Sequence, residues 1–305
     1  MWLRAGYVAA VSIRRGVPSC GKQAAPKIGM RGFSSSFLLF FYQIALGGLF
    51  GLAFTPFNEL DRAFYKSTGG VLFVIALLGF WGKTNLYLHS ISKSFSWIVA
   101  ADALAHFLFV VFFACYIVSL WGERRLFRAR TFAACIFSGL AGIFLSAHSF
   151  YEAPIGSIET LVYPLSFFLS CLLLGSVTVG MLIGHWYLID TGQTLDPFIR
   201  IYKFFVISLV VQSCFSPVSF LLLYFLGTDQ SIVELEKLWA HHSTLLMTRV
   251  LIGYLGPLAL SWMIWRTLLI PHTMAATGLF YIALLGVFVG EILSKQLLAL
   301  ASLPF

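Results

Sequence analysis

Long, uninterrupted apolar runs constrain this chain more than any other feature of its sequence. A helix needs about 20 apolar residues to cross a bilayer core. Runs of that kind predict spans at Phe37–Phe57, Phe64–Trp81, Trp97–Trp121, Thr131–Phe150, Leu161–Leu188, Phe198–Leu226, Ser243–Leu269 and Thr273–Leu300. The runs are continuous rather than alternating, which excludes the strands of a membrane barrel. We therefore expect an all-α integral membrane protein, a bundle of about eight transmembrane helices with no soluble domain.

The amino-acid composition supports this fold class and argues against several classes of function. The chain is 59% hydrophobic and 10% charged, whereas a soluble domain has about 25% charged residues. The net charge is +8, but the basic residues are not interleaved with the polar surface that a nucleic-acid site needs. Lipid is therefore the expected partner, and nucleic acid is not. The five cysteines show no Cys-x-x-Cys spacing, which argues against a disulfide framework or a thiolate metal site.

Residues 1–33 differ from the rest of the chain. They contain bases but no acid: Arg4, Arg14, Arg15, Lys22, Lys27 and Arg31. We interpret this stretch as a basic N-terminal tail that is disordered, or that lies upstream of a true start at Met30. Residues 34–305 then form the helical bundle.

The distribution of lysine and arginine gives two opposite indications of orientation. One set of loops carries Arg62, Lys66, Arg200, Lys203, Arg266 and the group Arg124, Arg125, Arg128 and Arg130. The opposite loops hold Lys83, Lys93 and Lys237, with Lys295 near the end. The dense arginine group favours a cytoplasmic position for the first set, in a bacterial inner (plasma) membrane. The basic tail argues for the reverse orientation.

An acid and an imidazole interrupt the third apolar run. Asp102 and His106 are four residues apart, so they share one face of a helix. A carboxylate inside a span costs about 2.5–3.5 kcal/mol on insertion scales, which makes it a candidate functional group. The alternative is structural: the two side chains hydrogen-bond to each other and to a neighbouring helix.

Histidines gather at one end of the predicted bundle. Eight spans bring His89, His148, His241 and His242 to the same side, with Asp102 and His106 beneath them. A b-type haem takes two axial imidazoles at matched depth, and His148 with His241 or His242 satisfies this condition. His185 is better explained as an anchor at the membrane surface.

A quinone site is the preferred interpretation of this polar group. Such a site needs a hydrogen-bond donor and a proton acceptor, which Asp102, His106 and Arg249 would supply as catalytic residues. The same residue types also suit the proton relay of a transporter or channel. A third alternative is a structural or assembly subunit without chemistry.

The last span ends in a short motif, Gly290-Glu291-Ile292-Leu293-Ser294-Lys295. It resembles the Gly-Glu-Leu-Leu-x-Arg ending of quinol-linked membrane anchor subunits of the dimethyl-sulfoxide-reductase and polysulfide-reductase type, with lysine in place of arginine. The resemblance implies a bundle of about eight helices that exchanges electrons between the quinone pool and a partner iron–sulfur subunit. It adds Glu291 and Lys295 to the candidate residues.

Three further patterns concern packing. Gly47 with Gly51, Gly180 with Gly184, and Gly286 with Gly290 have the four-residue spacing that lets helices approach closely. Pro217 and Pro257 should bend the sixth and seventh spans. The stretch from 229 to 243 alternates charged and apolar residues, as in a short amphipathic helix on the surface or a face for another subunit.

Overall fold

The structure is a computed structural model and describes residues 32–305 except 56, 58, 94, 95, 152, 155, 191, 193 and 271. Residues 1–31, which include most of the basic tail and Met30, lie outside the described residues. The helices are α2 (Phe33–Ala53), α3 (Arg62–Lys93), α4 (Trp97–Ser119), α5 (Arg125–His148), α6 (Glu159–Ile189), α7 (Asp196–Leu226), α8 (Asp229–His241), α9 (Ser243–Arg249), the π-helix η1 (Val250–Leu255), α10 (Gly256–Leu268) and α11 (Thr273–Ala301).

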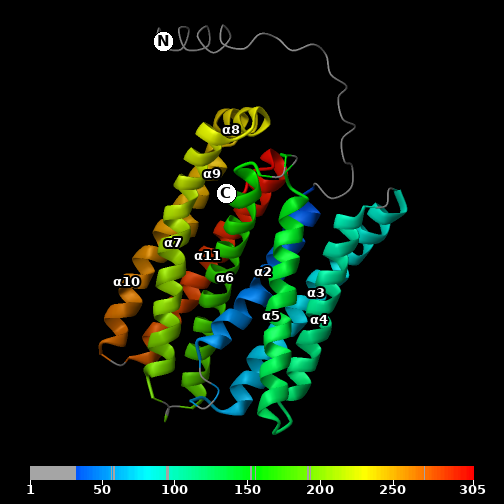
Figure 1. Ribbon diagram of the computed structural model, residues 1–305. Coiled ribbons are helices and arrows are strands. Elements are labelled where there is room, and N and C mark those ends of the chain that lie inside the picture. Colours follow the sequence, from blue (N-terminus) through cyan, green and yellow to red (C-terminus); the bar gives the residue numbers. More distant parts are fainter. Residues whose placement is uncertain are drawn as a thin grey trace, which may run out of the picture.

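Eight segments of the described chain are long and apolar enough to cross a membrane, with α9, η1 and α10 together forming one of them. This confirms the predicted fold class of a multi-pass helical membrane protein. Successive spans run in opposite directions (Figure 1). The α3–α4 turn, the start of α6 and the short helix α8 lie at one end, here named the α8 end. The α4–α5, α6–α7 and α10–α11 loops lie at the other end, here named the Arg-rich end.

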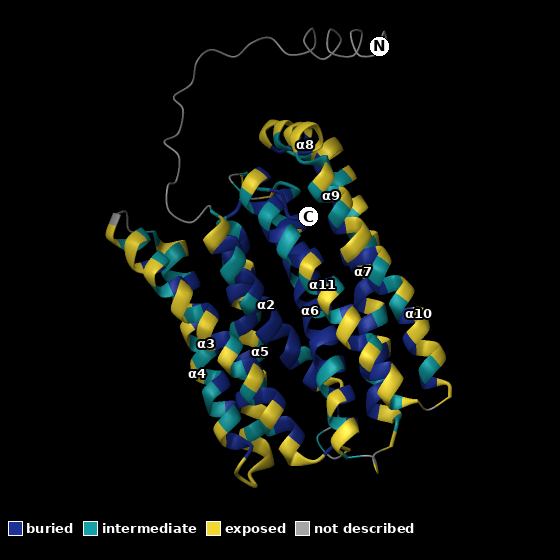
Figure 2. Cartoon of the chain, turned by 180° about the vertical axis from the view of Figure 1, so that it is seen from behind, coloured by how far each residue is buried: buried dark blue, intermediate teal, exposed yellow. Residues whose placement is uncertain are grey.

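Two helices form the centre of the bundle. Most residues of α2 and α6 are buried, whereas fewer than half are buried in the apolar stretches of the other spans (Figure 2). Glycine explains their close approach, because a Cβ atom on Gly47 would lie 1.8 Å from the Cys171 carbonyl oxygen. A Cβ on Gly175 would lie 1.8 Å from the Gly47 carbonyl carbon. The small-residue spacing in the first span therefore marks a true helix–helix contact.

The second span is longer than the sequence predicts. We expected it to end at Trp81, followed by a loop with Lys83 and His89, but α3 continues to Lys93. At 1.5 Å per residue, its 32 residues span about 48 Å, more than the thickness of the hydrocarbon core. The polar stretch after Trp81 was therefore wrongly assigned to a loop. Lys83 is buried inside the bundle, with 3% of its surface exposed.

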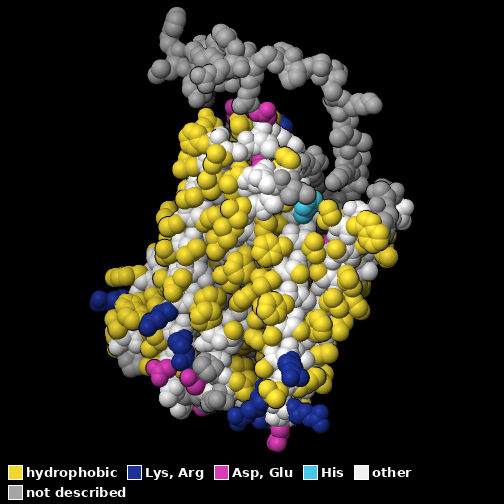
Figure 3. All heavy atoms as spheres, in the orientation of Figure 1, with side chains coloured by type: hydrophobic (Ala, Val, Ile, Leu, Met, Phe, Trp, Pro, Cys, Tyr) yellow, Lys and Arg dark blue, Asp and Glu magenta, His cyan; other side chains and the backbone are white. Residues whose placement is uncertain are grey.

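The burial of two lysines strengthens the charge asymmetry. Lys83 and Lys295 were counted with the loops opposite the arginines, but both are buried within helices. Exposed Lys and Arg side chains gather at the Arg-rich end, which is the lower end in Figure 3. In the described part of the chain, positive charge is therefore concentrated at the Arg-rich end more strongly than the sequence predicts.

The predicted amphipathic helix is confirmed as α8. It begins after Thr228 and lies across the α8 end of the bundle (Figure 1). Its own Leu235 and Leu238 are buried on the face that packs against the bundle. Pro217 lies inside α7, and Pro257 lies in the first turn of α10, two residues after the π-helix η1 ends at Leu255. The seventh span therefore departs from regular α-helix where proline was expected to disturb it.

Candidate functional site

The first candidate site is a buried polar cluster between α3, α4 and α5, here named the Lys83 cluster. It contains Lys83 and Tyr87 of α3, Asp102 and His106 of α4, and Ser146 of α5, each at most 4% exposed. Lys83 and His106 lie at nearly equal distances along the chain from the α3–α4 turn. An antiparallel helix pair therefore brings them to the same depth.

Each polar group in the Lys83 cluster has a partner. The Lys83 ammonium lies 3.1 Å from His106 Nε2 and 3.0 Å from Ser146 Oγ. It is also 3.6 Å from Asp102 Oδ2. The Asp102 carboxylate accepts from the Tyr87 hydroxyl at 2.7 Å and from the Ser146 hydroxyl at 2.8 Å. One cation therefore faces one carboxylate, and each is hydrogen-bonded.

The hydrogen-bond partners of His106 show which of its two ring nitrogens carries the proton. An ammonium group can only donate, so Nε2 of His106 must accept from Lys83. Nδ1 then carries the proton and lies 2.9 Å from the Asp102 main-chain oxygen and 3.2 Å from Asp102 Oδ1. The Tyr42 ring packs against the imidazole at a centroid distance of 4.1 Å. His106 is thus held as a neutral ring with both nitrogens engaged.

Lys83 is the member of this cluster that the sequence does not indicate, because local hydropathy predicts a loop there. The available signal was the spacing of Lys83 and Tyr87, which places both on one face of a helix if the helix continues past Trp81. The predicted pairing of Asp102 with His106 is present in the structure.

The second candidate site lies in the other half of the bundle and is here named the Arg249 cluster. Its members are Ser170 of α6, Gln212 of α7, Arg249 of α9, Tyr254 of η1, and Glu291 and Lys295 of α11. The Arg249 Nη2 atom donates to the Tyr254 hydroxyl at 2.7 Å and lies 3.4 Å from Glu291 Oε1. Lys295 lies 3.5 Å from Glu291 Oε2. No hydrogen bond or ion pair described in the structure joins this cluster to Asp102 or His106.

The π-helix explains why Arg249 reaches Tyr254. The two residues are five apart, which places them on different faces of an α-helix but aligns them across a wider π turn. Close backbone packing holds this turn, because a Cβ on Gly290 would lie 2.4 Å from the Gly253 Cα. The Gly286–Gly290 spacing noted in the sequence therefore places η1 against α11, next to Glu291.

The two clusters differ in how completely they are satisfied. In the Arg249 cluster, Arg249 and Lys295 face the single carboxylate of Glu291, and all three residues are at most 2% exposed. Arg249 Nε and Nη1 and Gln212 Oε1 have no hydrogen-bond partner, and Glu291 Oε2 has only the ion pair with Lys295. Buried unpaired donors and acceptors are costly, and together they suit bound water or a ligand. The Lys83 cluster contains no such atoms among its described residues.

A cavity of about 300 Å³ adjoins the Arg249 cluster and is partly open to the outside of the bundle. It is here named the Tyr254 cavity, because Tyr254 joins its wall to Arg249. Its lining residues are Ser213, Ser216, Pro217, Phe220, Trp239, Leu246, Val250, Tyr254 and Phe305. The Ser213 hydroxyl oxygen is buried without a partner. The cavity thus combines apolar walls with three hydroxyl groups, those of Ser213, Ser216 and Tyr254.

The remaining histidines do not provide a pair of buried imidazoles. Of the seven histidines in the chain, only His106 is buried, and both of its ring nitrogens are engaged. His148 is half-buried beside Tyr151, with ring centroids 5.3 Å apart. His241 is exposed and His242 half-buried at the end of α8. The structure therefore places these residues at the α8 end as expected, without a pair of buried imidazoles.

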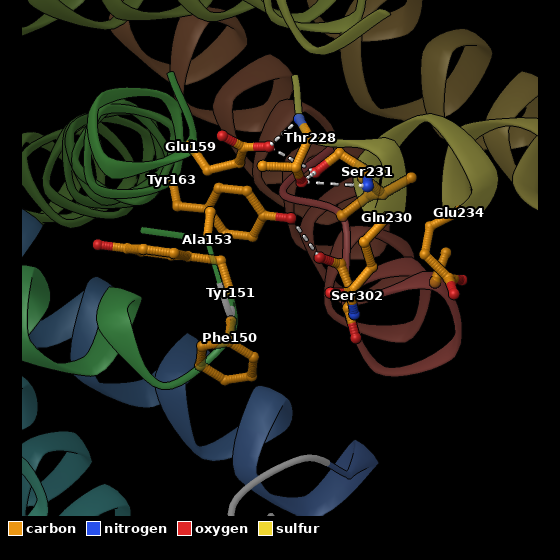
Figure 4. Close-up of a pocket in the computed structure, with 12 residues that line it drawn as sticks. Phe150, Tyr151, Ala153, Glu159, Tyr163, Thr228, Gln230, Ser231, Glu234 and Ser302 are labelled. Atoms are coloured by element: carbon orange, nitrogen blue, oxygen red, sulfur yellow. Dashed lines mark hydrogen bonds between the residues drawn. The ribbon is translucent and has the colours of Figure 1, made fainter. Parts of the chain in front are cut away.

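A small pocket at the α8 end has a structural explanation (Figure 4). Its volume is about 20 Å³, which is room for about one water molecule. Glu159, which is 0% exposed, accepts from the Thr228 main-chain N–H at 2.7 Å and from the Ser231 hydroxyl at 2.8 Å. The carboxylate therefore caps the start of α8 and fixes it over α6.

Comparison with protein-family models, with curated proteins and with solved structures finds no match to this chain.

Proposed function

We propose that this protein is an integral membrane subunit of a respiratory or redox complex that binds a quinone in the Tyr254 cavity. In this proposal it resides in the bacterial inner (plasma) membrane and exchanges electrons with the quinone pool through a partner subunit. The observation that carries the proposal is the hydrogen-bonded connection from Tyr254 on the cavity wall through Arg249 to Glu291.

The cavity has the properties that a quinone head group requires. Its volume of about 300 Å³ is at the lower end of typical ligand pockets, which suits a ring more than a whole lipid. Trp239 and Phe220 supply apolar and aromatic wall. The Tyr254 oxygen accepts from Arg249, which leaves its own proton to donate to a quinone carbonyl. The unpaired Ser213 hydroxyl offers a second hydrogen bond.

In the proposed reaction this chain exchanges protons with the quinone, and the partner subunit exchanges electrons with it. Oxidation of a quinol to a quinone releases two electrons and two protons, and reduction consumes them. In this proposal the electrons pass to or from a one-electron carrier, such as an iron–sulfur centre, in the partner subunit. The Glu291 carboxylate, fixed by Arg249 and Lys295, exchanges protons with the cavity through Tyr254 and bound water.

Tryptophan fluorescence tests the binding site directly. A short-chain benzoquinone should quench the fluorescence of the protein in nanodiscs, and Trp239→Phe should remove the saturable part of the quenching. Tyr254→Phe should weaken binding about 2- to 10-fold, the effect of one lost hydrogen bond. Tyr281→Phe is the matched control, because Tyr281 bonds His185 at 3.2 Å away from this cavity. Unchanged quenching in Trp239→Phe would exclude this site.

Electron transfer needs a separate measurement. Membranes of the native host should oxidise added quinol with an artificial electron acceptor, and the rate should fall when Glu291→Gln replaces the wild-type subunit. Quinone binding without any rate that depends on this protein would retain the site but reject the redox role.

The Lys83 cluster supports a second candidate, proton-coupled transport. Three ionisable side chains from two spans are in contact at its centre, which are the residue types of a proton relay. Proteoliposome flux that disappears in Asp102→Asn, without any redox activity, would favour this function. Normal activity of the host complex with Asp102→Asn would instead favour a purely structural cluster.

A further inference from the structure

A second cavity lies at the Arg-rich end, away from the Tyr254 cavity. Its volume is about 240 Å³, and it is formed by the end of α2, the α2–α3 connection and the adjoining turns of α3, α4 and α5. Leu52 and Phe132 form part of its apolar wall, while Arg125 and Arg128 bring two guanidinium groups to it. It is here named the Arg128 cavity.

The arginines of this cavity have no acidic partner in the part of the chain that the structure describes. Among the residues that the structure describes, no carboxylate forms an ion pair with Arg62, Arg125 or Arg128. Arg125 and Arg128 thus bring two cations to one cavity without an ion-paired carboxylate among the described residues, and a bound anion would relieve their repulsion.

Arg128 is held in place yet retains a free donor. Its guanidinium carbon lies 3.8 Å from the centre of the Phe57 ring, within the range of a cation–π contact. Its Nη1 atom is buried and has no hydrogen-bond partner. An oriented guanidinium with an unused N–H group is well suited to binding a phosphate oxygen.

The location of the cavity indicates the source of that phosphate. Arg125 begins α5 at the end of the bundle where Lys and Arg side chains gather (Figure 3). This is the level of the lipid head groups, and basic pockets between spans at this level bind anionic head groups. The apolar wall next to the arginines offers contact to the glycerol backbone and the first methylene groups of an acyl chain.

We propose that the Arg128 cavity is a binding site for the phosphate head group of an anionic phospholipid. Arg128 and Arg125 bind the phosphate, and Leu52 and Phe132 contact the lipid next to it. This site is independent of the quinone site, so either proposal can fail without the other.

Lipid titration of purified protein tests the site. We expect short-chain phosphatidylglycerol to bind at least 10-fold more tightly than phosphatidylcholine of the same chain length, and to raise the unfolding temperature of the wild-type protein more. Inorganic phosphate and glycerol 3-phosphate test whether the head group alone suffices. Binding of these ions as tight as that of the lipid would assign the site to a soluble phosphate and overturn the lipid proposal.

Two double variants with the same change in charge locate the site. Arg125→Ala with Arg128→Ala should reduce phosphatidylglycerol affinity at least 10-fold. Arg124→Ala with Arg130→Ala is the matched control, because these arginines are exposed and do not line the cavity. Equal losses in both variants would mean a diffuse charge effect and overturn the proposal. Arg128→Lys keeps the charge but loses the guanidinium group, so it should also bind phosphatidylglycerol more weakly. If a variant fails to fold, the comparison of phosphatidylglycerol with phosphatidylcholine on the wild-type protein still tests the proposal.

Discussion

Lys83 of α3 donates a hydrogen bond to His106 of α4, with 3.1 Å between Nζ and Nε2. The contact joins two residues that are 23 positions apart and makes Asp102, which is 0% exposed, part of a closed ionic network. The charge that seemed anomalous in the apolar sequence of α4 is therefore compensated from the neighbouring helix.

Removing the Lys83 ammonium group should destabilise the protein, because the buried Asp102 carboxylate would lose its counter-charge. Lys83→Met leaves Asp102 without a counter-charge, and breaking a buried pair in this way costs about 3–5 kcal/mol. We expect a marked fall in the unfolding temperature in detergent. Adding Asp102→Asn to Lys83→Met should recover much of the loss, because no unpaired charge remains. A double variant less stable than the sum of the single changes would contradict this account.

Close packing of α2 and α6 makes a second prediction. Gly47→Ala should lower the unfolding temperature, because its Cβ would lie 1.8 Å from the Cys171 carbonyl oxygen. Gly70→Ala in α3 is the control, since a Cβ there meets nothing within 4 Å. The control should be neutral or more stable by up to about 1 kcal/mol, the helix-propensity difference between the two residues. Equal unfolding temperatures for the two variants would show that the helices can separate freely.

The Glu159 cap should control the stability of α8. Glu159→Ala removes the acceptor for the Thr228 N–H and the Ser231 hydroxyl, and a lost cap costs about 0.5–2 kcal/mol. Hydrogen exchange at residues 228–241 should accelerate about 2- to 30-fold, while the central helices remain unchanged. Glu236→Ala, an exposed change in the same helix, should have no such effect. Slow exchange in both variants would show that α8 is held by its apolar face alone.

Glu291 should be essential to the Arg249 cluster. Glu291→Gln leaves Arg249 and Lys295 buried without a carboxylate, so we expect lower stability as well as the lost quinol activity proposed above. The added change Lys295→Gln removes one of the two cations and should restore part of the stability but not the activity. Glu234→Gln, whose ion pair with Lys237 is exposed, is the control. Recovery of activity in the double variant would exclude Glu291 as the proton-exchanging group.

Much of the architecture follows from local sequence. The spans are predictable because apolar runs of membrane length allow only helices whose backbone groups bond internally. The Asp102–His106 contact and the glycine spacings are also local, since helical geometry alone places residues four apart on one face. The short helix α8 shows its amphipathic pattern directly.

Contacts between spans required the tertiary structure. The polar stretch after Trp81 indicated a loop, because local hydropathy does not show that α4 and α5 provide partners for Lys83. Arg249 was grouped with Asp102 and His106, whereas helix rotation and the π turn direct it to Tyr254 and Glu291. The sequence by itself determined how many helices span the membrane and which faces carry polar groups. Only the tertiary structure decided which polar groups meet, because each meeting depends on the depth and rotation of two helices at once.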